Sequence, residues 1–295
     1  MTVLYDREEV GLRGWLAGFR RQLFGHLPTI GLGGGLLALM VFVAIFAPYL
    51  FTLDPITFTP IDRLQSPNAA HWLGTDMYGR DIYSRTVYGT RISLIVGLAA
   101  ASLSVAAGLL IGLLSGYVRL LDAVLMRIMD GLMAIPPILL AIALVSLSGA
   151  SLVTVTVAIT VPEIPRVVRL VRSIVLSVRE EPYVEAAISV GTPLPAILWR
   201  HVLPNTIPPL IVQATYVCAS AMLTEAILSF LGAGTPPEIP SWGNMMAEGR
   251  LYFQIAPWIV LVPGLALALT VLAVNVLGDG LRDTLDPRIA KRMRT

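Results

Sequence analysis

The chain has 295 residues, of which 56% are hydrophobic and 14% are charged, with a formal net charge of +2. A soluble domain carries roughly 25% charged residues, so this composition excludes an ordinary soluble fold and indicates an integral membrane protein. The small net charge gives no support for a nucleic-acid partner.

Long apolar blocks follow one another along the chain, and each is long enough for a membrane-spanning helix, which needs about 20 residues. A spanning helix satisfies its own backbone hydrogen bonds inside the bilayer. We therefore predict an all-α integral membrane fold with six transmembrane helices. The candidate spans are residues 28–50, 92–118, 123–147, 152–171, 207–231 and 255–277.

Orientation follows from the concentration of Arg and Lys on the cytoplasmic side of membrane proteins. With the N-terminus inside, most of the 21 basic residues fall on the inner face, which predicts that both termini are cytoplasmic. The predicted divisions are a cytoplasmic segment 1–27, a first helix 28–50, an outer loop 51–90, a core 91–281 with an inner loop at about 180–205, and a cytoplasmic tail 282–295.

The inner loop contains the charged, proline-rich segment EEPYVEAAISVGTPLPAILWRHVLPN. Pro182 suits the first position of a helix, and Gly191 suits the left-handed position that closes one. Thr192 is expected to cap a second helix that begins at Pro193 and ends before Pro204. The pattern predicts a helical hairpin, either folded on its own bundle or serving as a docking knob. Its expected exposed residues are Ala186, Ala187, Val190, Ile197 and Leu198.

The same segment resembles the EAA loop of bacterial ABC importer membrane subunits, and this resemblance favours the docking knob. It implies that the hairpin forms coupling helices that bind in a groove of a cytoplasmic ATPase subunit. His201 takes a position that is often aliphatic in the wider family but is suited to the peptide branch. The residues that match the motif are Glu185, Ala186, Ala187, Gly191, Leu203 and Pro204.

Four further segments resemble the oligopeptide, dipeptide and nickel branch of these importers, and its C-type rather than its B-type subunit. They are HWLGTDMYGRDIYSRTVYGTRISLIVG, MDGLMAIPPILLAIALV, EAILSFLGAGTPPEIPSWGNMM and LGDGLRDTLDPR. The first of them carries the outer-loop motif residues Gly74, Thr75, Asp76, Gly79, Arg80 and Asp81.

The resemblance implies a type I ABC importer transmembrane fold in the bacterial inner membrane. The implied partners are a B-type permease subunit, two cytoplasmic ATPase subunits, an extracytoplasmic solute-binding protein and membrane lipid. The implied function is that of a permease subunit forming half of a path for di- or oligopeptides. Glutathione and nickel chelates stay open as alternative solutes.

The chain is not expected to hydrolyse ATP itself. A phosphate-binding P-loop ends in Lys followed by Ser or Thr, and the chain's one lysine, Lys291, lies in no such motif. The run GLGGG in the first span favours small-residue helix packing instead. We predict a non-catalytic chain without a cofactor, with ATP and Mg bound by the partner ATPase subunits.

The histidines His26, His71 and His201 fall in three separate segments without metal-ligand spacing. An outer metal site of His71 with Asp76 and Asp81 is one hypothesis, and turn capping with loop hydrogen bonds is the other. A secondary transporter would need an ion path and commonly shows repeats with discontinuous helices, which the sequence does not suggest.

Glu225 is predicted to lie within a membrane span, where an ionisable side chain is a functional candidate. It would either line the translocation path or hydrogen-bond a neighbouring helix, and Ser229 and Trp242 join it as path or gate candidates. Trp242 is also expected to be an interfacial anchor. Asp130 is predicted to be a cap or an interhelical partner.

A second charged pair is expected within the fourth span. Glu163 and Arg166 stand three residues apart, which is within reach of a pair on one helix.

Overall fold

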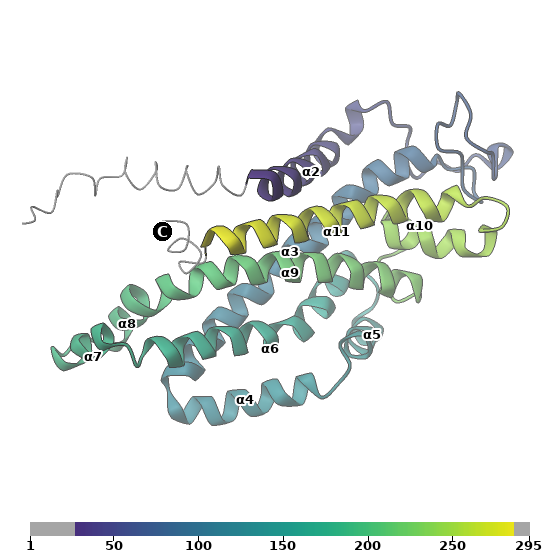
Figure 1. Ribbon diagram of the computed structural model, residues 1–295. Helices are drawn as coiled ribbons and strands as arrows, with labels where there is room; N and C mark the ends of the chain where they lie inside the picture. The colour runs from purple at the N-terminus through teal and green to yellow at the C-terminus, as the bar shows by residue number, and fades with distance from the viewer. Residues whose placement is uncertain (1–26, 286–295) are drawn as a thin grey trace, which may run out of the picture.

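The computed structural model describes residues 27–285, and its regular structure is almost wholly helical, as predicted (Figure 1). The charged lead 1–26 and the end of the predicted tail, 286–295, lie outside the described residues. The longer helices are α2 (Leu27–Phe46), α3 (Ile82–Tyr117), α4 (Arg119–Met133), α5 (Pro137–Ser148), α6 (Leu152–Val178), α9 (Leu203–Phe230) and α11 (Trp258–Leu285). The shorter ones are α7 (Pro182–Ser189), α8 (Leu194–Ile197) and α10 (Trp242–Gly249).

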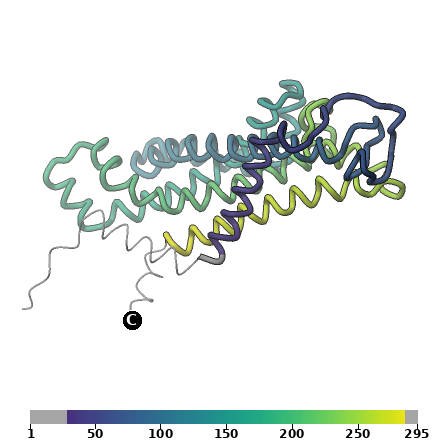
Figure 2. Tube along the Cα trace, turned by 90° about the horizontal axis from the view of Figure 1, so that it is seen from above, coloured from purple at the N-terminus to yellow at the C-terminus, as the bar shows by residue number. Residues whose placement is uncertain are grey.

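The long helices run back and forth, with α3 through the middle of the bundle against α6 and α9. The α7–α8 hairpin lies at one end, whereas α10 and the loop after α2 lie at the other (Figures 1 and 2). The start of α2 meets the end of α11, because a side chain at Gly280 would touch Ile30. The loop predicted to be outer therefore lies opposite the hairpin predicted to be inner.

By length and composition, α2, α3, α9 with α8, and α11 qualify as membrane spans. The predicted span 123–147 is not one helix, because α4 and α5 meet at a 90° bend. Pro136 and Pro137 explain the bend, since proline lacks the N–H and disfavours helical geometry in the residue before it. The helix α6 has 27 residues but carries several charged side chains.

The second span begins earlier than the sequence suggested. Asp81 caps α3, and its carboxylate accepts a hydrogen bond of 2.8 Å from the backbone N–H of Ser84. The predicted outer loop 51–90 therefore ends at Asp81, and residues 82–90 form the first turns of a 36-residue helix.

A seam of glycines lets α3 approach α6 closely. A Cβ added at Gly112 would lie 2.6 Å from the Cβ of Val171, closer than carbon atoms can pack. The same close approach of a glycine to a valine recurs one helical turn before and one turn after this pair. Three valine side chains of α6 therefore pack against three glycines of α3. The pairs are Gly108 with Val167, Gly112 with Val171, and Gly116 with Val175.

The GLGGG run of α2 was predicted to allow close helix packing, and one of its glycines packs closely against α11. A Cβ at Gly33 would lie 2.5 Å from the backbone nitrogen of Leu277 in α11. Gly31 and Gly35 would meet no described atom within 4 Å. The first and last spans therefore come into close contact at Gly33 of α2 as well as at Gly280 of α11.

The seam predicts a position-specific cost of a single methyl group. Gly112→Ala should lower the stability of the detergent-solubilised protein by about 1–3 kcal/mol, because the added Cβ overpacks the seam. Gly35→Ala, a matched change in open space, should be neutral or slightly stabilising, since alanine favours helix. Thermal unfolding of both variants measures the difference, and equal stabilities would contradict the role of the seam.

Candidate functional site

The α7–α8 hairpin begins and turns as its sequence indicates. Pro182 is the first residue of α7, and Gly191 closes the helix with φ of +83°. The backbone N–H of Gly191 donates to the carbonyl of Ile188 at 2.9 Å, and that of Thr192 donates to the carbonyl of Ala187 at 3.1 Å. These two bonds form a Schellman motif, which requires a left-handed residue at the position of Gly191.

The second limb of the hairpin differs from the prediction. Its N-cap is Pro193 rather than Thr192, and no side chain caps it. It also does not end before Pro204, because a π-helical turn at Leu198–Val202 joins α8 directly to α9. Pro204 fits there because the π turn directly before it already departs from the i→i−4 hydrogen-bond pattern that its missing N–H could not complete. The limb and the spanning helix α9 are therefore continuous.

The hairpin has a buried and an exposed face. Val184, Ile197 and Val202 belong to the main core cluster, so the prediction that Ile197 is exposed was wrong. Leu198 and Ala187 are half-buried. The opposite face exposes Glu185 and Ala186, together with the apolar side chains Ile188, Val190, Leu194 and Trp199. Val190 beside the turn is 86% exposed, and Trp199 is 75% exposed.

A polar clamp closes the base of the hairpin. The Asn205 side-chain amide donates to the Tyr183 hydroxyl at 3.2 Å and to the backbone carbonyl of His201 at 2.7 Å. The rings of Tyr183 and His201 lie 5.9 Å apart. The clamp connects α7 with the start of α9, so His201 of the predicted motif contributes by packing.

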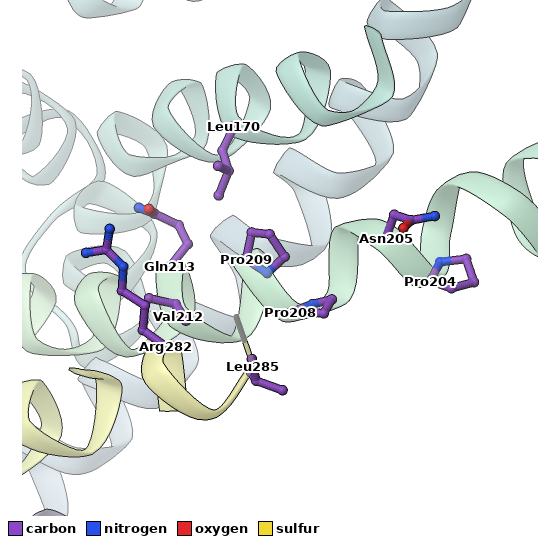
Figure 3. A pocket seen from close by; sticks show the side chains of 9 residues that line it. All are labelled: Leu170, Pro204, Asn205, Pro208, Pro209, Val212, Gln213, Arg282 and Leu285. Carbon is purple, nitrogen blue, oxygen red and sulfur yellow. The ribbon is translucent and has the colours of Figure 1, made fainter. Parts of the chain in front are cut away.

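A pocket of about 670 Å³ lies at the root of the hairpin, between α6, α9 and the end of α11 (Figure 3). Most of its lining is apolar, while Asn205, Gln213 and Arg282 supply polar groups. Asn205 therefore belongs both to the clamp and to the pocket wall. The lining residues are Leu170, Pro204, Asn205, Pro208, Pro209, Val212, Gln213, Arg282 and Leu285.

Charged residues of α6 pair toward two different neighbouring helices. Arg166 binds Glu163 at 2.9 Å, which confirms the predicted pair, and the Ser220 hydroxyl of α9 donates to Glu163 at 3.3 Å. Arg169 reaches Asp130 of α4 at 2.6 Å. Of the two roles predicted for Asp130, the structure therefore shows the interhelical partner.

Glu225 and Trp242 lie in the interior of this chain. Glu225 is fully buried, and one of its oxygens accepts a hydrogen bond of 2.9 Å from Ser229. Trp242 is also fully buried, with its indole N–H donating to the carbonyl of Thr86 at 3.0 Å. The expectation that Trp242 is an interfacial anchor was wrong, because its ring packs beside Gly89, where a larger residue would not fit.

The outer-loop motif forms a buried ion network with α10. Arg80 binds Asp76 at 2.6 Å and Glu248 at 2.5 Å. Arg85, which is fully buried, lies 3.5 Å from the same Glu248 carboxylate. Burial raises the pKa of Glu248, although the neighbouring guanidinium groups of Arg80 and Arg85 oppose that rise. Asp76 and Glu248 thus compensate two buried cations and bind the loop to α10.

The other motif residues shape this loop. His71 Nδ1 lies 3.0 Å from the carboxylate of Asp81, whereas Asp76 turns toward Arg80. Within residues 27–285, no three side chains of the metal-binding types lie close enough together to hold an ion. The structure therefore does not support a metal site of His71, Asp76 and Asp81. Thr75 bridges to Asp81, and Gly74 and Gly79 have φ of +77° and +75°.

Several residues of these sites were missed in the sequence. Glu248 and Arg85 lie outside the recognised motif residues, and Tyr183 and Asn205 flank the hairpin without an obvious pairing pattern. Their partners are up to 168 residues away in sequence, as for Arg80 and Glu248. A signal was nevertheless present for the arginines of α6, since repeated charges in a spanning segment mark a water-facing or paired surface.

Comparison with known proteins identifies related chains. Residues 104–291 match the family described as "Binding-protein-dependent transport system inner membrane component". A "probable peptide ABC transporter permease protein" of Sinorhizobium fredii is 58% identical over 90% of this chain and 91% of its own. A "dipeptide transport system permease protein" of Alkalihalophilus pseudofirmus is 43% identical over 93% and 90%. A "glutathione transport system permease protein" of Pectobacterium atrosepticum is 42% identical over 93% and 91%.

A solved structure shares the fold. It is an inward-facing methionine ABC transporter, matched with a TM-score of 0.56 over 68% of this chain and 96% of that chain. The sequences are 19% identical, so this likeness concerns the fold alone.

The clamp at the hairpin base predicts a measurable loss of rigidity. Asn205→Ala should speed amide hydrogen exchange in α7 by roughly two- to tenfold, since a hydrogen bond contributes about 0.5–1.5 kcal/mol. Ser189→Ala, which removes only a local bond to the Glu185 carbonyl, serves as the control. Unchanged exchange in α7 of the Asn205 variant would show that the clamp does not hold the hairpin.

Proposed function

The chain belongs to the family of binding-protein-dependent transport system inner membrane components, and from this premise we propose that it forms half of a path for peptides across the bacterial inner membrane. It is a permease subunit of an ABC importer and is not the ATPase, which is a separate chain in such systems.

Peptide is the favoured solute because the relatives named above carry "peptide", "dipeptide" and "glutathione" in their names. Glutathione is itself a small peptide, so the three names share one chemistry. Each solute carries an ammonium and at least one carboxylate, and such a zwitterion needs a path that offers both charges.

The neighbouring faces of α6 and α9 that bear Glu163, Arg166 and Ser220 are our candidate for part of that path. Ionisable side chains inside a membrane bundle are costly unless they pair or face water. Glu163, Arg166 and Ser220 form such a paired cluster, and Arg166 remains 38% exposed. The pocket bordered by Gln213 and Arg282 lies on the same two helices nearer the hairpin, and we take it as the inner mouth.

The hairpin is our candidate for the contact with the ATPase subunit. The observation that carries this proposal is the continuous rod from α8 through the π turn into α9, which also borders the pocket. Exposed apolar residues near the turn, such as Val190 and Trp199, give the knob a surface to bury. A push on the knob would therefore reach the wall of the path through unbroken helical backbone.

The opposite end is our candidate for the outer face. The network of Asp76, Arg80 and Glu248 makes the outer loop and α10 one rigid platform for an extracytoplasmic binding protein. We place Glu225, Ser229 and Trp242 at the outer gate, where they hold the segment after α9. Both termini would then be cytoplasmic, and a B-type permease subunit would supply the other half of the path.

Rigid coupling predicts that the turn of the hairpin tolerates only certain residues. Gly191→Leu should leave the protein in the membrane but uncouple uptake from hydrolysis, because a left-handed conformation costs an ordinary residue about 1–2 kcal/mol. The variant is assembled with its companion subunits in proteoliposomes, and ATP hydrolysis and peptide uptake are measured together.

A matched control separates conformation from size at this position. A Cβ at Gly191 would meet no described atom within 4 Å, so space is not limiting. Gly191→Asn should keep most of the uptake, since asparagine accepts the left-handed conformation. Normal uptake by the leucine variant would contradict rigid coupling through this turn.

Substrate and coupling can be tested in the same preparation. Proteoliposomes that contain the binding protein are offered labelled dipeptides, longer peptides, glutathione and a nickel chelate. We expect ATP-dependent uptake of peptides that Glu185→Arg reduces at least tenfold, because the charge reversal lies on the exposed face of the hairpin. Uptake of the nickel chelate alone would overturn the substrate, and uptake that an ionophore but not ATP depletion abolishes would indicate a secondary transporter.

A further inference from the structure

The helix α4 is attached to this chain in an unusual way. Of its 15 residues only Met129 is buried, although the helix is rich in apolar side chains. Leu120, Val124 and Ile128 are each more than half exposed. Apolar packing against the described residues therefore does little to hold α4 in place.

Two ion pairs join α4 to α6 instead. Arg172 uses Nε and Nη2 to bind both oxygens of Asp122, at 2.5 and 2.7 Å. Arg169 binds Asp130 at 2.6 Å. Asp122 and Asp130 are two helical turns apart, so the pairs grip α4 near its start and near its end.

Both pairs lie at the surface of this chain. The side chains of Arg169 and Asp130 are 45% and 56% exposed, and those of Arg172 and Asp122 are 31% and 23% exposed. Exposed pairs are individually weak, since water competes for each partner. Two such pairs can therefore form and break together without leaving a charge stranded in an apolar core.

The helix is also bounded by a joint at each end. Val118 has an extended conformation, with φ of −100° and ψ of 103°, between α3 and α4. At the other end, residues 134–136 separate α4 from α5 with the 90° bend. A helix between two non-helical joints can turn as a unit, because the φ and ψ changes are confined to a few residues.

We propose that Arg169 and Arg172 are positioning residues that latch α4 against α6, and that release of both pairs lets α4 move as an inner gate. The proposal rests on the proposed function, since it takes the side of α6 that bears Arg166 as the wall of the path. The latched and released arrangements are two states whose balance the transport cycle shifts. Arg166 is not part of the latch, because its partner Glu163 lies on its own helix.

The first test locks the latch. Asp122→Cys and Arg172→Cys are introduced together in a Cys218→Ala background and joined by a bifunctional methanethiosulfonate reagent, which dithiothreitol reverses. In proteoliposomes that contain the full transporter, cross-linking should lower the rate of peptide uptake at least tenfold. Reduction of the cross-link should restore that rate. Each single-cysteine variant treated with the same reagent is the control. Unchanged uptake by the cross-linked protein would overturn the gate.

The second test releases the latch. Asp122→Asn with Asp130→Asn should raise ATP hydrolysis in the absence of binding protein by roughly two- to tenfold, since two weak pairs are lost. A separate variant, Asp122→Arg with Arg172→Asp, keeps an ion pair at this position with the charges exchanged. Its rate of ATP hydrolysis should be close to that of the parent. Arg63→Gln, a neutralised arginine in the outer loop, is the matched control. A purely structural strut predicts lower assembly and no rise in hydrolysis, and that result would overturn the proposal.

The two proposals fail in distinguishable ways. If neither the parent nor the reduced, unlinked variant takes up peptide, the proposed function is contradicted. Normal uptake by the parent together with indifference to the cross-link would contradict only the latch.

Discussion

The close contact between α3 and α6 is the packing on which the rest of the bundle depends. Valine side chains of α6 fill the space left by the glycines of α3. Within a membrane, lipid is as apolar as the helices, so close packing of small residues supplies much of the association. Gly112 and its neighbours bring the backbones together, and α9, α2 and α11 assemble around α3. The hairpin follows the end of α6 near the seam, and the loop that precedes α3 lies at the opposite end of that long helix.

The two ends of the molecule are held by different physics. At the loop end, Arg80 and Arg85 are buried, and Asp76 and Glu248 compensate their charge. Removing one partner from such a network leaves a buried charge uncompensated, so this end is stiff. At the hairpin end, α4 depends on exposed ion pairs that water can replace. A rigid platform and a releasable gate at opposite ends suit a subunit that alternates access.

Local chemistry explains which features of the hairpin were predictable. Pro182 and Gly191 act within one or two residues of themselves, so their sequence positions determined the start of α7 and its left-handed end. Ile197 was assigned to the wrong face because its burial depends on a core cluster formed by residues from distant parts of the chain. Trp242 was misplaced for the same reason, since its cavity exists only beside Gly89 of a distant helix.

The sequence by itself determined the membrane class, the approximate spans, the hairpin and the family motif, because hydropathy, proline, glycine and charge bias act locally. Tertiary structure alone decided that residues 123–147 bend by 90°, that α8 continues into α9, and that Arg172 meets Asp122 across 50 residues of chain. Those outcomes depend on which helices lie side by side. That arrangement follows from the fit of many side chains at once, which no short stretch of sequence records.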